Sequence, residues 1–258
     1  MQSFGVTTNL PRPARQKGFT LPELLVVIAV IATLAALLLP VLAKSKSKAT
    51  QTVCRNQLRQ LGIGFMLHLA DHDDIFPTGA ATSALGAQPE DWIWWQVQPD
   101  ANGNPVMRDT RQSALVPSLG GYNPRHFRCP ADKDALAREQ AWRQNMSGEQ
   151  YIYSYSLNAF SECGMASYIS KDRSMIFFNR HSRIINPSQK IMLAEEKGGA
   201  GDGPGSAAID DGRWLPPGYP LSVRHSGRAN VAFADSHVET VRREFADSSH
   251  PEHYDPKK

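Results

Sequence analysis

The sequence has few of the residues that build a metal centre or a disulfide framework. Its 258 residues include only three cysteines, Cys54, Cys129 and Cys163, which lie far apart in the chain. They show none of the paired spacings that are typical of zinc sites, so we expect no structural metal. In an oxidising compartment, one disulfide with one thiol left over stays open as an alternative.

The chain also lacks an excess of basic charge that could bind nucleic acid. The formal net charge is +3, from 28 Lys and Arg against 25 Asp and Glu. Arg12, Arg15 and Lys17 lie in the first 18 residues, which contain no acidic residue. Removing these three from 28 leaves 25 basic side chains against 25 acidic ones from residue 19 onward. We therefore expect no nucleic-acid partner, since such binding needs a clustered basic face.

Catalytic signatures are missing as well. The sequence contains no Gly-x-Ser-x-Gly motif, phosphate-binding loop or dinucleotide fingerprint. Cys129, His225 and Asp235 could be written as a nucleophilic triad, but separation in sequence says nothing about contact in space. We expect neither an enzyme nor a cofactor, and an exported hydrolase is the outlying alternative.

Histidines and carboxylates offer two weak candidates for a metal site. His225, Asp235 and His237 could ligate a metal ion, but their spacing matches no known calcium loop. His68 and His72 lie four residues apart, without the intervening glutamate of His-Glu-x-x-His. We interpret these last two as solvated residues at a helix end.

Only one apolar run is long enough to cross a membrane. Residues 19–43 contain a single charged side chain, Glu23. As a helix they would rise roughly 37 Å at about 1.5 Å per residue, which is enough to span a bilayer. A basic stretch followed by an apolar run fits a cleaved secretory signal, a simple anchor or a buried core helix.

The residues at the start of this run separate the alternatives. Gly18 precedes the apolar run, whereas a secretory signal is cut at small residues after it. If Phe19 were a new N-terminus, Pro22 would lie where a helix does not need its N–H. Glu23 would then lie near the positive end of the helix dipole and near the new ammonium group. An unpaired charge costs on the order of 3 kcal/mol at the bilayer centre, so we expect a partner such as another subunit.

Residues 17–23, KGFTLPE, resemble the cleavage and methylation motif of type IV prepilins and type II secretion pseudopilins. The resemblance implies that a prepilin peptidase cuts after Gly18 and methylates Phe19, and that Glu23 pairs with a neighbouring subunit during assembly. It also implies a leader over 1–18 in the cytoplasm and a single-pass protein of the bacterial inner membrane. The implied partners are the prepilin peptidase, other pilin-like subunits and the membrane.

An apolar stripe continues beyond the membrane segment. Its members recur at spacings of four, three, four and four residues, as in one face of a helix: Cys54, Leu58, Leu61, Phe65 and Leu69. We expect a helix extension over 44–75 that packs this stripe on a globular domain over 76–258. That domain would lie in the periplasm or outside the cell.

Alternating or short apolar segments predict strands over 151–157, 190–194, 230–234 and 237–241. Asp235 and Ser236 separate the last two and suit a two-residue hairpin turn. The predicted fold class is α+β, with a long membrane-spanning N-terminal helix that continues into, and packs on, an antiparallel β-sheet domain. This is a pilin-like arrangement.

Three tryptophans, Trp92, Trp94 and Trp95, lie close together before these strands. Their alternation suggests a half-buried strand. We interpret them as filling a small core, and a sugar-binding platform is the alternative.

His225, nine intervening residues and Asp235 resemble the C-terminal signature of a large exported prepilin-like family, usually described as His, nine residues, Asp-Gly. Ser236 stands where glycine is usual, and a positive φ there would cost serine about 1 kcal/mol. We interpret His225 and Asp235 as structural, with a hydrogen bond that fixes the hairpin to the preceding loop. Cys54 and Cys129 lie in phrases shared with this family, which favours a disulfide between them and leaves Cys163 free.

The sequence therefore predicts a structural subunit that assembles through its N-terminal helix into a type IV pilus or a type II secretion pseudopilus. The alternative is a membrane-tethered, exported binding or adhesion protein that uses the same export signal without forming filaments.

Overall fold

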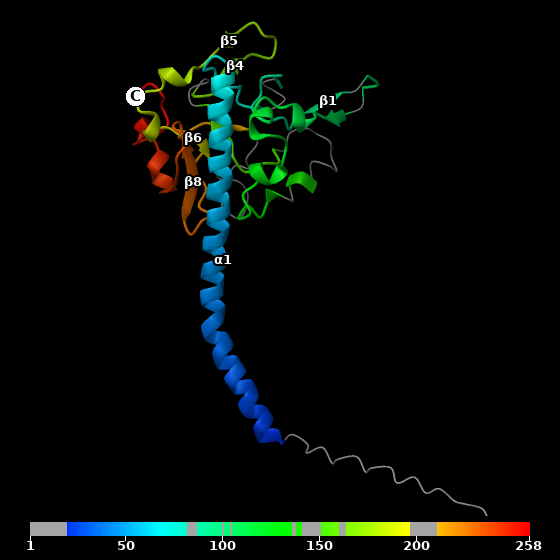
Figure 1. The fold of residues 1–258 in the computed structure, drawn as a ribbon, viewed down its shortest axis with the longest axis vertical. Helices are drawn as coiled ribbons and strands as arrows, with labels where there is room; N and C mark the ends of the chain where they lie inside the picture. Colours follow the sequence, from blue (N-terminus) through cyan, green and yellow to red (C-terminus); the bar gives the residue numbers. More distant parts are fainter. Residues whose placement is uncertain are drawn as a thin grey trace, which may run out of the picture. The chain divides into compact units, whose positions relative to one another are not determined.

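Two units make up the chain, Met1–Ser45 and Lys46–Lys258. The computed structural model describes residues 20–81, 87–99, 101–103, 105–135, 138–140, 151–159, 164–196 and 211–258. A single helix, α1 (Leu21–Asp71), contributes its first part to one unit and its remainder to the other (Figure 1).

The described part of the first unit, residues 20–45, belongs to α1 from Leu21 onward and is largely apolar. Its large side chains are exposed along the helix, for example Leu25 at 55% and Leu38 at 65%. Among the described residues, α1 is the one helix that is long and apolar enough to cross a membrane, judged by length and composition alone. Its 51 residues rise about 77 Å in all, far more than a bilayer requires.

The second part of α1 packs into the globular unit. Cys54, Leu58, Leu61 and Phe65 are fully buried and Leu69 is 5% exposed, so the predicted stripe is confirmed. The helix ends at Asp71. It ends there because Asp73 and Asp74 take positive φ values of 52° and 65°, and the Asp74 N–H turns back to the carbonyl of Leu69.

Nine strands follow in the described residues: β1 (Val97–Pro99), β2 (Pro105–Met107), β3 (Ser156–Asn158), β4 (Tyr168–Ile169), β5 (Ile176–Phe177), β6 (Ile191–Ala194), β7 (Arg213–Trp214), β8 (Arg228–Phe233) and β9 (Val238–Arg242). Short 3₁₀ helices lie between the strands or, for the last two, after β9: η1 (Thr110–Gln112), η2 (Pro117–Leu119), η3 (Pro124–Phe127), η5 (His181–Arg183), η6 (Pro187–Gln189), η8 (Arg243–Ala246) and η9 (Pro251–His253).

The central sheet has the order β7-β3-β6-β8-β9, and β1-β2 and β4-β5 are separate hairpins. Neighbours in the central sheet are antiparallel except for β3 and β7, which are parallel. Figure 1 shows β6 and β8 beside the C-terminal part of α1. The predicted α+β class, with a helix packed on a largely antiparallel sheet, is therefore confirmed.

Both faces of the central sheet are covered. One face joins the helix stripe in the larger core, through residues that include Leu157, Met192, Leu193 and Ala232. The other face forms a second core with Ile191, Trp214, Val231, Phe233 and Tyr254. Strand β6 is apolar and buried at all four positions because a central strand between two cores has no solvated side.

The strand predicted over 151–157 is largely wrong, because only its end is part of β3. Tyr151, Tyr153 and Tyr155 are fully buried, and Ile152 and Ser154 between them are buried as well. The Arg138 side chain donates to the carbonyls of Tyr151 and Tyr153, at 3.0 Å each, and the Ser154 N–H donates to Phe127. These hydrogen bonds satisfy the backbone groups that would otherwise pair with a neighbouring strand.

The tryptophan segment is also not a strand, since β1 begins only at Val97. Trp92 and Trp95 are fully buried, and their indole N–H groups donate to the carbonyls of Gly212 and Ala80, at 3.1 and 2.9 Å. Trp94 is partly exposed and stacks against the Arg108 guanidinium at 3.7 Å. Two of the three tryptophans therefore fill the core, as the first interpretation expected.

The β8–β9 hairpin forms as predicted, but its turn differs. The Phe233 N–H donates to the carbonyl of His237, and the Ser236 N–H donates to the carbonyl of Phe233, so residues 234–236 form a three-residue loop. Ser236 has a φ of 71°, which is the position where such loops favour glycine. The prediction of a two-residue turn is wrong, because the observed loop contains a third residue, Ser236, whose left-handed conformation closes it.

Candidate functional site

The start of α1 is closed by a capping interaction. Glu23 Oε2 accepts hydrogen bonds from the backbone N–H of Thr20 at 2.9 Å and from its hydroxyl at 2.6 Å. Thr20 precedes the first helical residue and Glu23 is the third, which is the spacing of a capping box. Pro22 needs no N–H in this turn. Gly18 and Phe19 lie outside the described residues.

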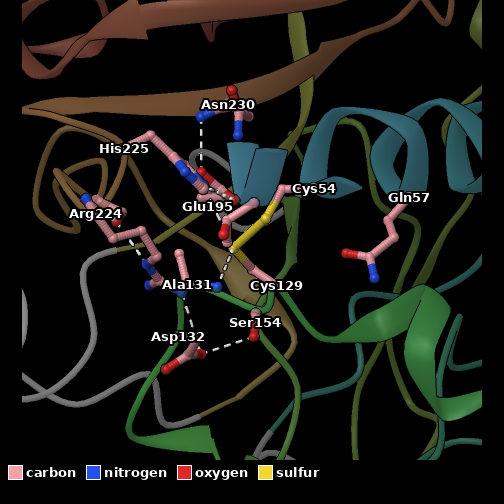
Figure 2. The surroundings of a disulfide bond; sticks show 12 residues. Cys54, Gln57, Cys129, Ala131, Asp132, Ser154, Glu195, Arg224, His225 and Asn230 are labelled. Atoms are coloured by element: carbon pink, nitrogen blue, oxygen red, sulfur yellow. Dashed lines mark hydrogen bonds and ion pairs between the residues drawn. A yellow bond between two sulfur atoms is a disulfide. The ribbon is translucent and has the colours of Figure 1, made fainter. Parts of the chain in front are cut away.

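A disulfide fastens α1 to the globular unit. It joins Cys54, on the buried stripe of the helix, to Cys129, which follows η3, with Cα atoms 5.2 Å apart (Figure 2). Cys54 is fully buried and Cys129 is 2% exposed. This is the pair that the family resemblance favoured. Cys163 lies outside the described residues.

A buried acid and imidazole lie against this disulfide. His225 Nε2 is 2.9 Å from Glu195 Oε1 and 3.3 Å from Cys129 Sγ. The other carboxylate oxygen of Glu195 accepts the backbone N–H of Asn230 at 2.7 Å. Figure 2 shows these side chains converging from the helix, the end of β6 and the loop before β8. The cluster is buried and its polar groups pair with one another, as buried polar groups must.

A second buried network lies beside this cluster. Asp132 Oδ2 is 2.7 Å from Arg138, 3.1 Å from Arg224 and 2.7 Å from the hydroxyl of Ser154. Burial alone would raise the pKa of the Asp132 carboxyl, but Arg224 and Arg138 outweigh burial and hold its pKa below the usual value. Asp132 therefore stays ionised and links the loop after Cys129 to the loop before His225.

His225 and Asp235 do not share the hydrogen bond that we expected. His225 is 2% exposed and belongs to the disulfide cluster. Asp235 lies in the β8–β9 turn, where its carboxylate accepts from the backbone N–H of His237 at 3.1 Å and from its ring. The prediction of a direct link is wrong because the partner of His225 is Glu195, which directly follows β6. His225, Asp235 and His237 do not form one group of metal ligands among the described residues.

His68 was expected to be solvated, and the structure places it in the core at 4% exposure. It lies on the same helix face as Leu61 and Phe65, and its ring stacks on His72, with centroids 4.0 Å apart. Burial, followed by the electrostatic effect of the neighbouring His72, lowers the pKa of His68 to about 4. His68 is therefore neutral at pH 7.

Sequence reasoning missed Glu195 and the role of Asp132. Glu195 directly follows β6, a strand whose four residues are all buried apolar side chains. A charged residue at the end of such a strand is a signal, because a fully buried carboxylate needs partners. The partners themselves come from distant segments, and only the fold shows which ones they are.

Comparison with known proteins adds to this geometry. Residues 13–39 match the family described as the prokaryotic N-terminal methylation motif. The chain is 40% identical over 70 residues to the type IV wide pilus major component PilA4 of Thermus thermophilus. This match covers 27% of the chain and 53% of the relative, so the similarity spans about half of the relative's length. No solved structure matches the chain. The expected resemblance to prepilins is confirmed, and the N-terminal segment of this chain is of the prepilin type.

Proposed function

We propose that this chain is a type IV pilin-like structural subunit. It is cut after Gly18 by a prepilin peptidase, methylated on Phe19 and assembled through its N-terminal helix into a pilus or a type II secretion pseudopilus. The observation that carries the proposal is the match of residues 13–39 to the N-terminal methylation motif. The similarity to a wide-pilus major component supports it.

The proposed organisation assigns a task to each part of the chain. Residues 1–18 are the leader, 19–43 the membrane and assembly helix, 44–75 its extension and 76–258 the exported domain. The exposed apolar surface of α1 supports this assignment, because an uncovered apolar helix needs lipid or neighbouring helices. The protein is then anchored once in the bacterial inner membrane, with its globular domain in the periplasm or outside the cell.

Glu23 takes the assembly role in this proposal. Both of its hydrogen bonds to Thr20 end on Oε2. A carboxylate has a second oxygen that can accept the methylated ammonium group of a neighbouring subunit's Phe19. Such a pair would neutralise a charge that is otherwise costly in the membrane.

Mass spectrometry of the membrane-extracted full chain tests processing. An N-terminus at methylated Phe19 supports the proposal, and an intact Met1 contradicts it. Gly18→Leu should block the cut, since the residue before the cleaved bond is then bulky.

Two substitutions of Glu23 separate its charge from its capping role. Glu23→Ala removes both, whereas Glu23→Gln keeps an oxygen that can cap Thr20. Both variants should be cleaved normally and fail to enter filaments. Normal assembly of both variants would contradict the assembly role of Glu23, and normal assembly of Glu23→Gln alone would reduce Glu23 to a helix cap. Absence of the wild-type chain from filaments would favour the tethered binding protein.

A further inference from the structure

The four side chains of the disulfide cluster form a set of metal ligands. Cys54 Sγ, Cys129 Sγ, a carboxylate oxygen of Glu195 and a ring nitrogen of His225 all lie within 4.8 Å of one another, and all four residues are buried. They come from α1, the loop after η3, the end of β6 and the loop before β8 (Figure 2). Because the four residues lie far apart in the sequence, only the fold shows that they come together in one site.

The chemistry of this set matches one ion. Two thiolates, one imidazole and one carboxylate give four ligands of the types that zinc prefers, with the number of its tetrahedral structural sites. We propose that the dithiol state of this protein binds Zn²⁺ through Cys54, Cys129, His225 and Glu195. The disulfide and the zinc site are then alternative ways for the same residues to hold α1 to the sheet.

The binding step involves no change of oxidation state. Before the disulfide forms, each cysteine carries a thiol proton. Zn²⁺ binding releases these two protons and breaks the hydrogen bond between His225 Nε2 and Glu195, as the neutral ring moves its proton from Nε2 to Nδ1. The ion then bonds to both sulfurs, to Nε2 and to one oxygen of Glu195. In the disulfide state the sulfurs are bonded to each other and are no longer thiolates, so this state should not hold the ion.

The distances fit this exchange. Zinc bonds of about 2.3 Å to sulfur and about 2.1 Å to nitrogen and oxygen place tetrahedral ligands roughly 3.3 to 3.8 Å apart. Cys129 Sγ is already 3.3 Å from His225 Nε2, and this nitrogen is 2.9 Å from Glu195 Oε1. The two sulfurs have to move apart, as two thiols do when the bond between them is absent, and Nε2 and Oε1 have to separate by about 0.4 Å.

Neighbouring groups support a charged site. The Ala131 N–H donates to Cys129 Sγ at 3.4 Å, which favours a thiolate. The Asn230 N–H orients Glu195 through its other oxygen, at 2.7 Å. Three anionic ligands and one Zn²⁺ leave a net charge of −1. Arg138 and Arg224 both pair with Asp132 in the adjacent network, which places two guanidinium groups beside the cluster.

Cobalt titration tests the proposal on the full chain extracted in detergent. The protein is reduced with a phosphine, freed of metal and kept without oxygen, and Co²⁺ is added. One equivalent should produce thiolate-to-cobalt charge-transfer absorption with the visible bands of a tetrahedral ion, and Zn²⁺ should abolish both. The air-oxidised protein should show neither. A reduced wild-type chain without the charge-transfer absorption would overturn the proposal, and no variant is needed for that result.

Variants then identify the ligands. Glu195→Gln and His225→Gln should each weaken Zn²⁺ binding by roughly 10- to 100-fold or more. Their fold is checked in the disulfide state by circular dichroism. Cys163→Ser and His253→Gln are the controls. His253 belongs to a partly exposed cluster with His250 and Glu252, which could bind metal without thiolates. Both controls should keep the cobalt spectrum, and unchanged affinity in both cluster variants would overturn the assignment.

Discussion

Gly62 on α1 and Ser236 in the β8–β9 turn are in direct contact. A Cβ atom added to Gly62 would lie 3.2 Å from Cβ of Ser236 and 3.4 Å from its backbone. The helix and the hairpin approach this closely because residue 62 has no side chain. The same turn holds Ser236 at a φ of 71°, a conformation that favours glycine.

Gly62→Ala should therefore destabilise the globular unit, although alanine is the better helix former by about 1 kcal/mol. Ser236→Gly removes the Cβ that the added methyl group would meet, and glycine also tolerates the positive φ. The loss of stability caused by Gly62→Ala should therefore be smaller in a chain that carries Ser236→Gly than in the wild type, by roughly 0.5 kcal/mol or more. Urea unfolding of the wild type, both single variants and the double variant, followed by tryptophan fluorescence, measures the interaction free energy between the two positions. Gly64→Ala is the control, because Gly64 lies on the same helix as Gly62 but faces Leu119 of η2. Its effect on stability should add to that of Ser236→Gly.

The Cys54–Cys129 disulfide closes a loop of 75 residues. Replacing both cysteines by alanine should lower the free energy of unfolding by roughly 2 to 5 kcal/mol, since the unfolded chain regains the entropy of that loop. Cys163→Ala should have little effect by comparison. Thiol titration of the denatured, exported protein should find one thiol without reductant and three after reduction. Equal titres under both conditions would show that the disulfide does not form.

Asp132→Asn leaves Arg138 and Arg224 buried without their carboxylate. This should cost roughly 3 to 5 kcal/mol at pH 7, as for other broken buried pairs. Because the folded-state pKa of Asp132 lies below the unfolded value, its contribution is present above about pH 4 and is lost as the pH falls through the folded pKa. Urea unfolding at several pH values should show this acid loss in the wild type and a weaker one in the variant.

The matched control is Asp109→Asn, because Asp109 pairs with Arg111 on the surface. It should leave the stability at pH 7 unchanged, since exposed pairs contribute little. Equal losses from the two substitutions would contradict the buried role of Asp132.

His68 gives a second pH dependence. Its pKa is about 4 in the folded chain because of burial and of its neighbour His72, against about 6.5 when unfolded. Between these values the unfolded chain binds more protons, so the stability contributed by His68 falls as the pH drops from 6.5 towards 4. His68→Gln should flatten the decline in the free energy of unfolding between pH 7 and pH 5. An unchanged slope in the variant would show that His68 stays solvated.

The local sequence was sufficient to predict the elements that are marked by a pattern of apolar residues within one segment. The stripe of α1 from Cys54 to Leu69 has the period of a helix face, whereas the apolar run of α1 and the β8–β9 pair are continuous or short apolar segments bounded by polar residues. The prepilin-type segment is also local, because seven consecutive residues contain it. These features could be predicted without any knowledge of distant contacts.

The tertiary structure decided the features in which distant residues meet. Residues 151–155 alternate like a strand, yet the Arg138 side chain binds the carbonyls of Tyr151 and Tyr153 instead of a neighbouring strand. The partner of His225 is Glu195, from the end of β6, and not Asp235. Burial, more than sequence spacing, selects these partners, because a polar group removed from water must bond to whatever the fold brings within reach.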